Sequence, residues 1–131
     1  MSSPVETVQP LYAAFGRGDK PALLAMLTDD VQWEHKGRLD LPYLGLFRGK
    51  AAVAQWFGHV AGCDDIQAFE PREFLGGPDH VTVFGWERTR ALPGGRVFEC
   101  DWVHVFVVKH GQIVSFREFA DCPAIEAAFR G

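Results

Sequence analysis

The sequence has few cysteines, no long apolar run and no excess of basic residues. Its three cysteines, Cys63, Cys100 and Cys122, form no CxxC pair and leave an odd one over, which argues against the disulfide framework of a secreted domain. No stretch approaches the roughly 20 apolar residues that span a bilayer, and the first ten residues lack the features of a signal peptide. We therefore expect a cytoplasmic protein with no membrane partner.

Motifs for several kinds of chemistry are also missing. The 13 basic and 17 acidic residues give a formal charge of −4, and no basic stripe is present to neutralise the phosphates of a nucleic acid. There is no GxSxG motif for nucleophilic catalysis, and Gly16-Arg17-Gly18 lacks the remainder of a phosphate-binding loop. We therefore expect no nucleic-acid partner, no nucleophilic catalysis and no phosphate-binding loop.

Aromatic residues are the abundant class. They make up 13% of the 131 residues, with eleven Phe, four Trp and two Tyr. A chain of this length is expected to form one domain, residues 1–131. So many large rings in a small domain indicate either a large core or a lined cavity.

The first part of the chain has helical spacing. Ser3 and Glu6 form a capping box before a helix that ends near Gly16. Asp19 is expected to cap a second helix through Leu27, followed by a turn at 28–30 and a strand at 31–35. Residues 36–48 are expected to form a loop that packs over another part of the protein. Residues 50–60 are expected to form a third helix.

The second part of the chain alternates with the period of strands. Strands are expected at 66–75, 80–90, 97–108 and 112–120, with Pro71 marking the first as an edge or bulged strand. Asp121 is expected to cap a short terminal helix. Helices followed by an antiparallel meander predict an α+β fold, with the helices on one face of a curved sheet.

Both faces of the long strand are apolar. Trp102, His104 and Phe106 share one face, and Val103, Val105 and Val107 share the other. We expect the helices to cover one face and a second copy of the chain to cover the other, which predicts a homodimer through the outer face of the sheet.

Four polar residues fall on apolar faces of the expected strands. Glu118 lies between Phe116 and Ala120, where aromatic neighbours are expected to raise its pKa towards the range of proton transfer; the alternative is a surface pair with Arg117 or Lys109. His104 is either a core residue whose ring nitrogens are hydrogen-bonded within the protein or a residue of a functional site. Glu87 either forms a cross-strand ion pair or belongs to the same site. His35 is the fourth.

Together, these residues suggest a general acid–base site in an aromatic cup. The expected catalytic residues are His35, Glu87, His104 and Glu118. Two histidines and two carboxylates could also hold a metal, but they lack the close spacing of metal ligands, so we expect neither metal nor cofactor. The expected substrate-binding rings are Trp33, Tyr43, Phe47, Trp56, Trp86, Trp102, Phe106 and Phe116.

Three strings resemble the nuclear transport factor 2-like superfamily, which includes ketosteroid isomerases, SnoaL-like polyketide cyclases and limonene-type epoxide hydrolases. They are LYAAFGRGDKPALLAMLTDDVQWE, PYLGLFRGKAAVAQWF and WVHVFVVKHGQIVSFREFAD. The resemblance covers nearly the whole chain. It implies a cone of helices and curved, mixed or antiparallel sheet, with the N-terminal helices packed on the concave face.

The resemblance also implies roles for the polar residues. His104 falls where the isomerases place their oxyanion-stabilising acid and where the cyclases have a pocket histidine. Glu118 falls where the cyclases and hydrolases carry a catalytic aspartate. His35 matches the general-base aspartate of the isomerases and the water-holding asparagine of the hydrolases. Glu87, in ERTRALPGGR, resembles one aspartate of the hydrolases' acid pair.

Two departures favour the cyclase pattern. Leu11 stands in place of the isomerases' helix tyrosine, and Gly85 in place of an arginine of the hydrolases. The resemblance therefore implies cofactor-free cyclisation or isomerisation of a small, largely apolar carbonyl substrate. Glu118 would take a proton next to the carbonyl, and His104 would hydrogen-bond or protonate the enolate oxygen. The alternatives are epoxide hydrolysis and a non-catalytic ligand-binding or dimerisation module.

Overall fold

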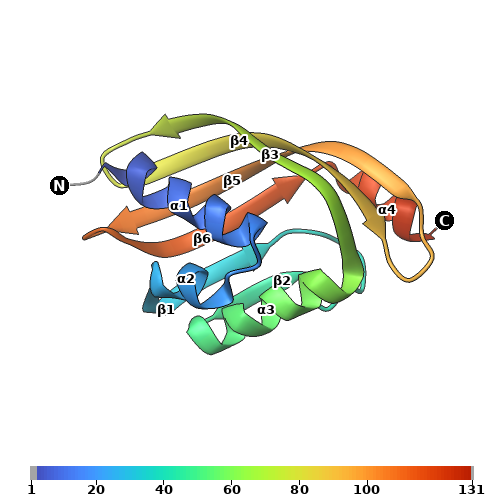
Figure 1. The fold of residues 1–131 in the computed structure, drawn as a ribbon, viewed down its shortest axis with the longest axis horizontal. Coiled ribbons are helices and arrows are strands. Elements are labelled where there is room, and N and C mark those ends of the chain that lie inside the picture. The colour runs from blue at the N-terminus through green and yellow to red at the C-terminus, as the bar shows by residue number, and fades with distance from the viewer. Residues whose placement is uncertain (1–2, 131) are drawn as a thin grey trace.

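The computed structural model describes residues 3–130, which form a strongly curved six-stranded sheet and four helices. Figure 1 shows α1, α2 and α3 on one face of the sheet and α4 at one end. The elements are α1 (Pro4–Gly16), α2 (Lys20–Ala25), β1 (Leu27–His35), β2 (Gly45–Arg48), α3 (Lys50–Cys63), β3 (Asp64–Gly76), β4 (His80–Ala91), β5 (Val97–Lys109), β6 (Gln112–Ala120) and α4 (Cys122–Arg130).

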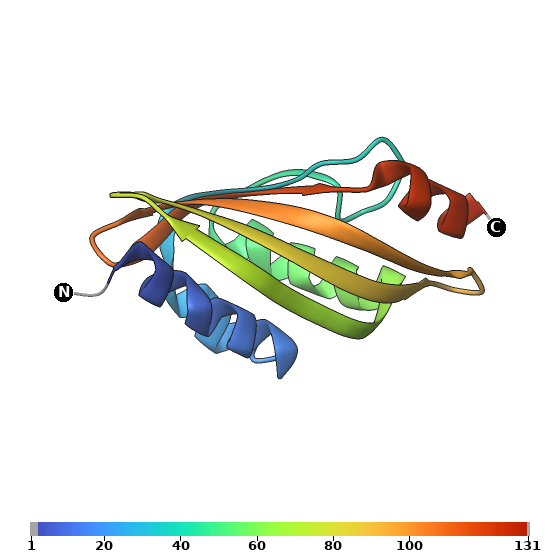
Figure 2. The same ribbon diagram turned by 90° about the horizontal axis from the view of Figure 1, so that it is seen from above.

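The strand order is β2-β1-β6-β5-β4-β3. All neighbours are antiparallel except β1 and β6, which are parallel. The α+β fold is thus confirmed, and β3 is the edge strand that Pro71 predicted, with a shift of register beside that proline. Figure 2 shows the curvature of the sheet, with the N-terminal helices within its concave side.

The predicted helix caps are confirmed. The backbone N–H of Glu6 donates to Ser3 Oγ at 3.2 Å, and the N–H of Ser3 donates to Glu6 Oε1 at 3.3 Å. Asp19 Oδ1 accepts from the N–H of Ala22, and Asp121 Oδ1 accepts from the N–H of Ala124. Each carboxylate or hydroxyl satisfies a backbone donor that has no partner within the helix.

Three expectations for residues 19–48 are wrong in whole or in part. The second helix ends at Ala25 rather than at Leu27, and residues 28–30 belong to β1 instead of a turn. Leu27 pairs with Ile113 of β6, so a ladder to a distant strand overrides the local turn signal. The expected loop at 36–48 contains β2, whose residues 45–48 pair antiparallel with β1.

The core lies between the concave face of the sheet and the helices. Trp102, His104 and Phe106 are buried on this face, as the alternation predicted, whereas Val103 and Val105 on the outer face are half-buried. A smaller cluster of Ala91, Phe98, Cys100 and Ala128 packs α4 against the end of the same face. No helix in residues 3–130 has the length and apolarity needed to cross a membrane.

Candidate active site

Three polar residues meet at the middle of the concave face because of strand register. Glu118 of β6 pairs directly with His104 of the antiparallel β5 and with His35 of the parallel β1. Residues directly opposite each other project to the same side of a sheet. The carboxylate therefore stands between two imidazoles, and all three residues are buried.

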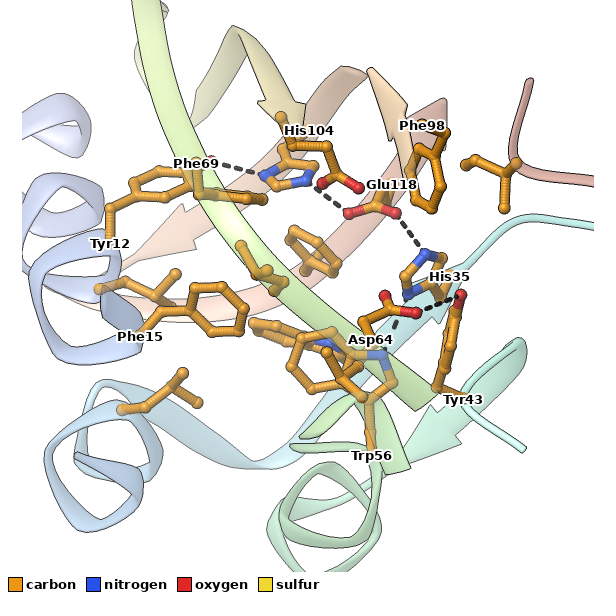
Figure 3. A pocket seen from close by; sticks show the side chains of 18 residues that line it. Tyr12, Phe15, His35, Tyr43, Trp56, Asp64, Phe69, Phe98, His104 and Glu118 are labelled. Atoms are coloured by element: carbon orange, nitrogen blue, oxygen red, sulfur yellow. Dashed lines mark hydrogen bonds and ion pairs between the residues drawn. The ribbon is translucent and has the colours of Figure 1, made fainter. Parts of the chain in front are cut away.

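These residues form a continuous line of hydrogen bonds (Figure 3). His104 Nε2 lies 2.7 Å from Glu118 Oε1, and His35 Nε2 contacts Glu118 Oε2. The line extends at both ends, since the Tyr12 hydroxyl lies 2.7 Å from His104 Nδ1, and Trp56 Nε1–H donates to His35 Nδ1 at 3.2 Å. Glu118 thus forms neither of the surface pairs considered from its sequence neighbours.

The pKa of Glu118 differs from the value expected from the sequence. Burial acts to raise the pKa of Glu118, but electrostatic attraction to His35 and hydrogen bonds from both imidazoles outweigh it and lower the pKa below the usual range. Burial lowers the pKa of His104, despite its bond to Glu118. The expectation of a raised Glu118 pKa is wrong, because a hydrogen-bonded carboxylate is stabilised in its charged form.

A second acidic group faces the same cavity. Burial and repulsion by Glu118 and Asp64 raise the pKa of Glu87 to about 8, and the Thr89 hydroxyl donates to its Oε1 at 3.3 Å. Burial also raises the pKa of Asp64 to about 6, although the Tyr43 hydroxyl donates to it at 3.2 Å. Among the described residues Glu87 has no ion-pair partner, so the cross-strand pair is not formed. Glu87 is a neutral acid at neutral pH.

The polar groups lie in an aromatic cavity between α1, α3 and the sheet. The empty space between its lining residues is about 600 Å³, and this volume includes the part of the cavity that is open to solvent. None of the lining residues, all within residues 3–130, is Lys or Arg. The lining is made of Leu11, Tyr12, Phe15, Leu23, Trp33, His35, Tyr43, Trp56, Val60, Asp64, Ile66, Phe69, Glu87, Phe98, His104, Phe116, Glu118 and Ile125.

All four expected catalytic residues line this cavity, and so do four of the eight expected rings, Trp33, Tyr43, Trp56 and Phe116. The other four rings do not. Phe47 packs half-buried against the core. Phe106 is buried, with its ring centroid 6.3 Å from that of His104 and 5.2 Å from that of Phe116.

Trp102 and Trp86 are the remaining two rings outside the lining. Trp102 is buried and stacks on His104, with 3.9 Å between the ring centroids. Trp86 lies on the outer face beneath the guanidinium of Arg72, 5.1 Å from the ring centroid. It cannot share the cavity with its neighbour Glu87, because successive side chains of a strand point to opposite faces.

Sequence reasoning missed Tyr12, Asp64 and Phe69. Leu11, which the resemblance aligns with the isomerases' tyrosine, lines the cavity, but the hydroxyl comes from the next residue, Tyr12. The spacing of Tyr12 with Val8 and Phe15 placed it on the apolar helix face, and this was the available signal. Asp64 was missed because β3 starts two residues earlier than expected.

Metal binding has no support in this geometry. In residues 3–130, no three His, Cys, Asp or Glu side chains form a group that could hold a metal ion. The two imidazoles face the carboxylate of Glu118 rather than a common point.

Solved structures with the same fold cover almost the whole chain. An NTF2-like protein from Burkholderia xenovorans is 35% identical, with a TM-score of 0.88 over 98% of each chain. One of unknown function from Burkholderia pseudomallei is 29% identical, with a TM-score of 0.86 over 100% of each. TerC, co-crystallised with polyporic acid, is 25% identical, with a TM-score of 0.87 over 99% of this chain and 100% of TerC.

A search of curated proteins finds no match. The family model described as a SnoaL-like domain matches residues 8–116. This match spans the helices that carry Tyr12 and Trp56 and the strands that carry His35 and His104. The chain belongs to the SnoaL-like family and has the NTF2-like fold.

Proposed function

We propose that this protein is an enzyme that cyclises or isomerises a small, largely apolar carbonyl compound by acid–base catalysis without a cofactor. The observation that carries the proposal is the Glu118 carboxylate, buried between two imidazoles that contact its two oxygens in an aromatic cavity. Burying such a charge is costly unless it is fully hydrogen-bonded. A carboxylate beside a neutral acid is the arrangement that proton transfer needs.

Glu118 is the proposed base and His104 the proposed donor. Before substrate binds, the His104 Nε2–H points at Glu118 and lowers the basicity of the carboxylate. A substrate carbonyl oxygen that takes over this N–H would gain a donor for its developing negative charge. The same exchange would remove a bond from Glu118 and raise its basicity as it meets the carbon-bound proton.

Glu87 and His35 have supporting roles in this proposal. Glu87, neutral below about pH 8, supplies a second proton donor to the substrate oxygen or to a leaving hydroxyl. His35 donates to the other oxygen of Glu118 and orients the carboxylate. The rings of Phe15, Trp56 and Phe69 exclude water, which strengthens each of these interactions.

The test is exchange of α-protons. A bicyclic aromatic ketone such as 2-tetralone is incubated with the protein in D2O, and loss of the α-proton signal is followed by NMR. We expect Glu118→Gln to lower the rate roughly 10²–10⁴-fold, the contribution of one positioned base. Glu34→Gln, on the opposite face of β1, is the matched control. An unchanged rate in Glu118→Gln contradicts the assignment, and no exchange by the native protein favours a ligand-binding module.

One observation also favours hydrolysis of an epoxide as a second candidate. The pKa values of Glu87 and Glu118 are driven in opposite directions, and an acid for the epoxide oxygen beside a base for water needs the same separation. Incorporation of labelled oxygen from H2¹⁸O into a diol product would support hydrolysis. Cyclisation and isomerisation incorporate none.

We also propose that two copies of the chain associate through the outer face of the sheet. Phe84 of β4 and Phe119 of β6, 42% and 40% exposed, lie on either side of Val103 of β5 in the register. Three apolar side chains in adjacent strands form a patch that water would otherwise contact. A second copy of the same sheet face could cover this patch symmetrically.

A further inference from the structure

The two histidines beside Glu118 differ in what occupies their second ring nitrogen. The indole N–H of Trp56 donates to Nδ1 of His35, and the hydroxyl of Tyr12 contacts Nδ1 of His104. An indole N–H can only donate a hydrogen bond, whereas a phenol hydroxyl can donate or accept. Each imidazole can therefore respond differently to an additional proton.

His35 is confined to one protonation state by this contact. Because the indole brings its own hydrogen, Nδ1 of His35 carries none, and the ring proton lies on Nε2, where Glu118 accepts it. A second proton on Nδ1 would face the indole hydrogen. It would also leave the N–H of the buried Trp56 without an acceptor, which is unfavourable away from water.

His104 has no such restriction. Its Nε2–H donates to Glu118, and while the ring is neutral the Tyr12 hydroxyl donates to Nδ1. If Nδ1 gains a proton, rotation of the hydroxyl turns its oxygen into the acceptor, and no hydrogen bond is lost. The resulting imidazolium would lie between the Tyr12 oxygen and the Glu118 carboxylate, which stabilises its charge.

Other titratable groups near the two rings do not reverse this difference. His35 also faces Tyr43, whose ring centroid is 4.8 Å away, and Asp64 at the start of β3, whose pKa of about 6 leaves it negatively charged only in the upper part of the pH range. Trp56, however, already occupies the nitrogen at which a proton would add. His104 faces the uncharged rings of Trp102 and Phe69, besides Tyr12, Glu118 and His35.

We propose that Trp56 and Tyr12 are positioning residues that decide which imidazole takes up a proton: His104 does, and His35 stays neutral with its proton on Nε2. In the reaction proposed above, His104 can then exchange protons, and His35 only donates to Glu118. The catalytic meaning rests on that proposed function. The order of protonation does not, because it is a property of the protein before substrate binds.

The test is imidazole ¹⁵N NMR of the full chain labelled at histidine, from pH 8 to pH 4, with signals assigned by single histidine substitutions. We expect Nδ1 of both rings to be unprotonated at pH 8, and Nδ1 of His104 to gain its proton first. Trp56→Phe should reverse the order, because Nδ1 of His35 is then free to bind a proton close to Asp64. Trp33→Phe is the matched control, since the buried Trp33 N–H has no partner among residues 3–130.

Tyr12→Phe provides an independent variant should Trp56→Phe not fold. It removes the acceptor for a protonated Nδ1, so His104 should no longer protonate before His35. The proposal is overturned if His35 protonates before or together with His104 in the native protein, or if neither does so before unfolding. It is also overturned if both variants keep the native order. Failure of the ketone exchange assay would instead contradict the proposed function and leave this order standing.

Discussion

Replacing Glu87 with Gln should change how stability depends on pH. The side chain is half-buried in the cavity, and desolvation and the nearby Glu118 and Asp64 raise its pKa to about 8 from the ordinary value of 4.5. Between these two values the unfolded chain has an ionised Glu87 and the folded chain has a neutral one. Stability of the native protein therefore falls as pH rises through this window. Gln keeps an oxygen to accept from the Thr89 hydroxyl but cannot ionise.

The size of the effect follows from the width of this window. Each pH unit between the two pKa values costs about 1.4 kcal/mol of unfolding free energy. Between pH 4.5 and pH 8 the native protein should thus lose about 4 kcal/mol through this group, allowing for partial titration at both ends. Glu87→Gln should match the native protein near pH 4.5 and exceed its stability by about that amount at pH 8.

Urea unfolding at half-unit intervals of pH, followed by tryptophan fluorescence, measures the difference directly. Asp64 and Glu118 titrate in both proteins, so subtracting the two curves isolates most of the effect of Glu87. Glu73→Gln, an exposed carboxylate on β3, is the control and should follow the native curve. Parallel curves for Glu87→Gln and the native protein from pH 5 to pH 8 would refute the assignment of a neutral Glu87.

Two further predictions concern packing. A Cβ at Gly85 would lie 2.2 Å from the ring of Trp102. Gly85→Ala should therefore lower the unfolding free energy by about 1–3 kcal/mol, the usual cost of overpacking. Gly94→Ala is the control, because a Cβ there would have nothing within 4 Å, and it should leave the unfolding free energy nearly unchanged in the same urea experiment. On the outer face, Phe84→Glu should halve the mass measured by light scattering, because a charge would be buried in the dimer; a native mass of one chain, or an unchanged mass in the variant, contradicts the proposed association.

The fold was largely predictable because most of its determinants are local. Ser3, Glu6 and Asp121 cap helices through backbone groups a few residues away, and the alternation of β5 and β6 depends only on neighbouring residues. The strand at Leu27 was not predictable in this way, since its pairing with Ile113 joins distant parts of the chain. Local turn residues do not reveal such a partner.

The sequence predicted which residues form the candidate site better than it predicted their protonation and hydrogen bonding. Strand parity placed His104 and Glu118 on the concave face, and the structure brings them together. Parity cannot show that both carboxylate oxygens accept from imidazoles, and this decides the direction of the Glu118 pKa. Parity places Trp86 and Glu87 on opposite faces of the strand. The prediction that both line one cavity was therefore inconsistent with the two-residue period of a strand.

The parallel pairing of β1 with β6 has a consequence for how the protein folds. His35 and Glu118 meet only through this ladder, which closes a chain loop containing most of the molecule. Closing so long a loop is entropically expensive and is repaid only when the intervening strands are in place. Partly folded species should therefore lack the contact between His35 and Glu118, and the imidazole signals of His35 should report completion of the sheet.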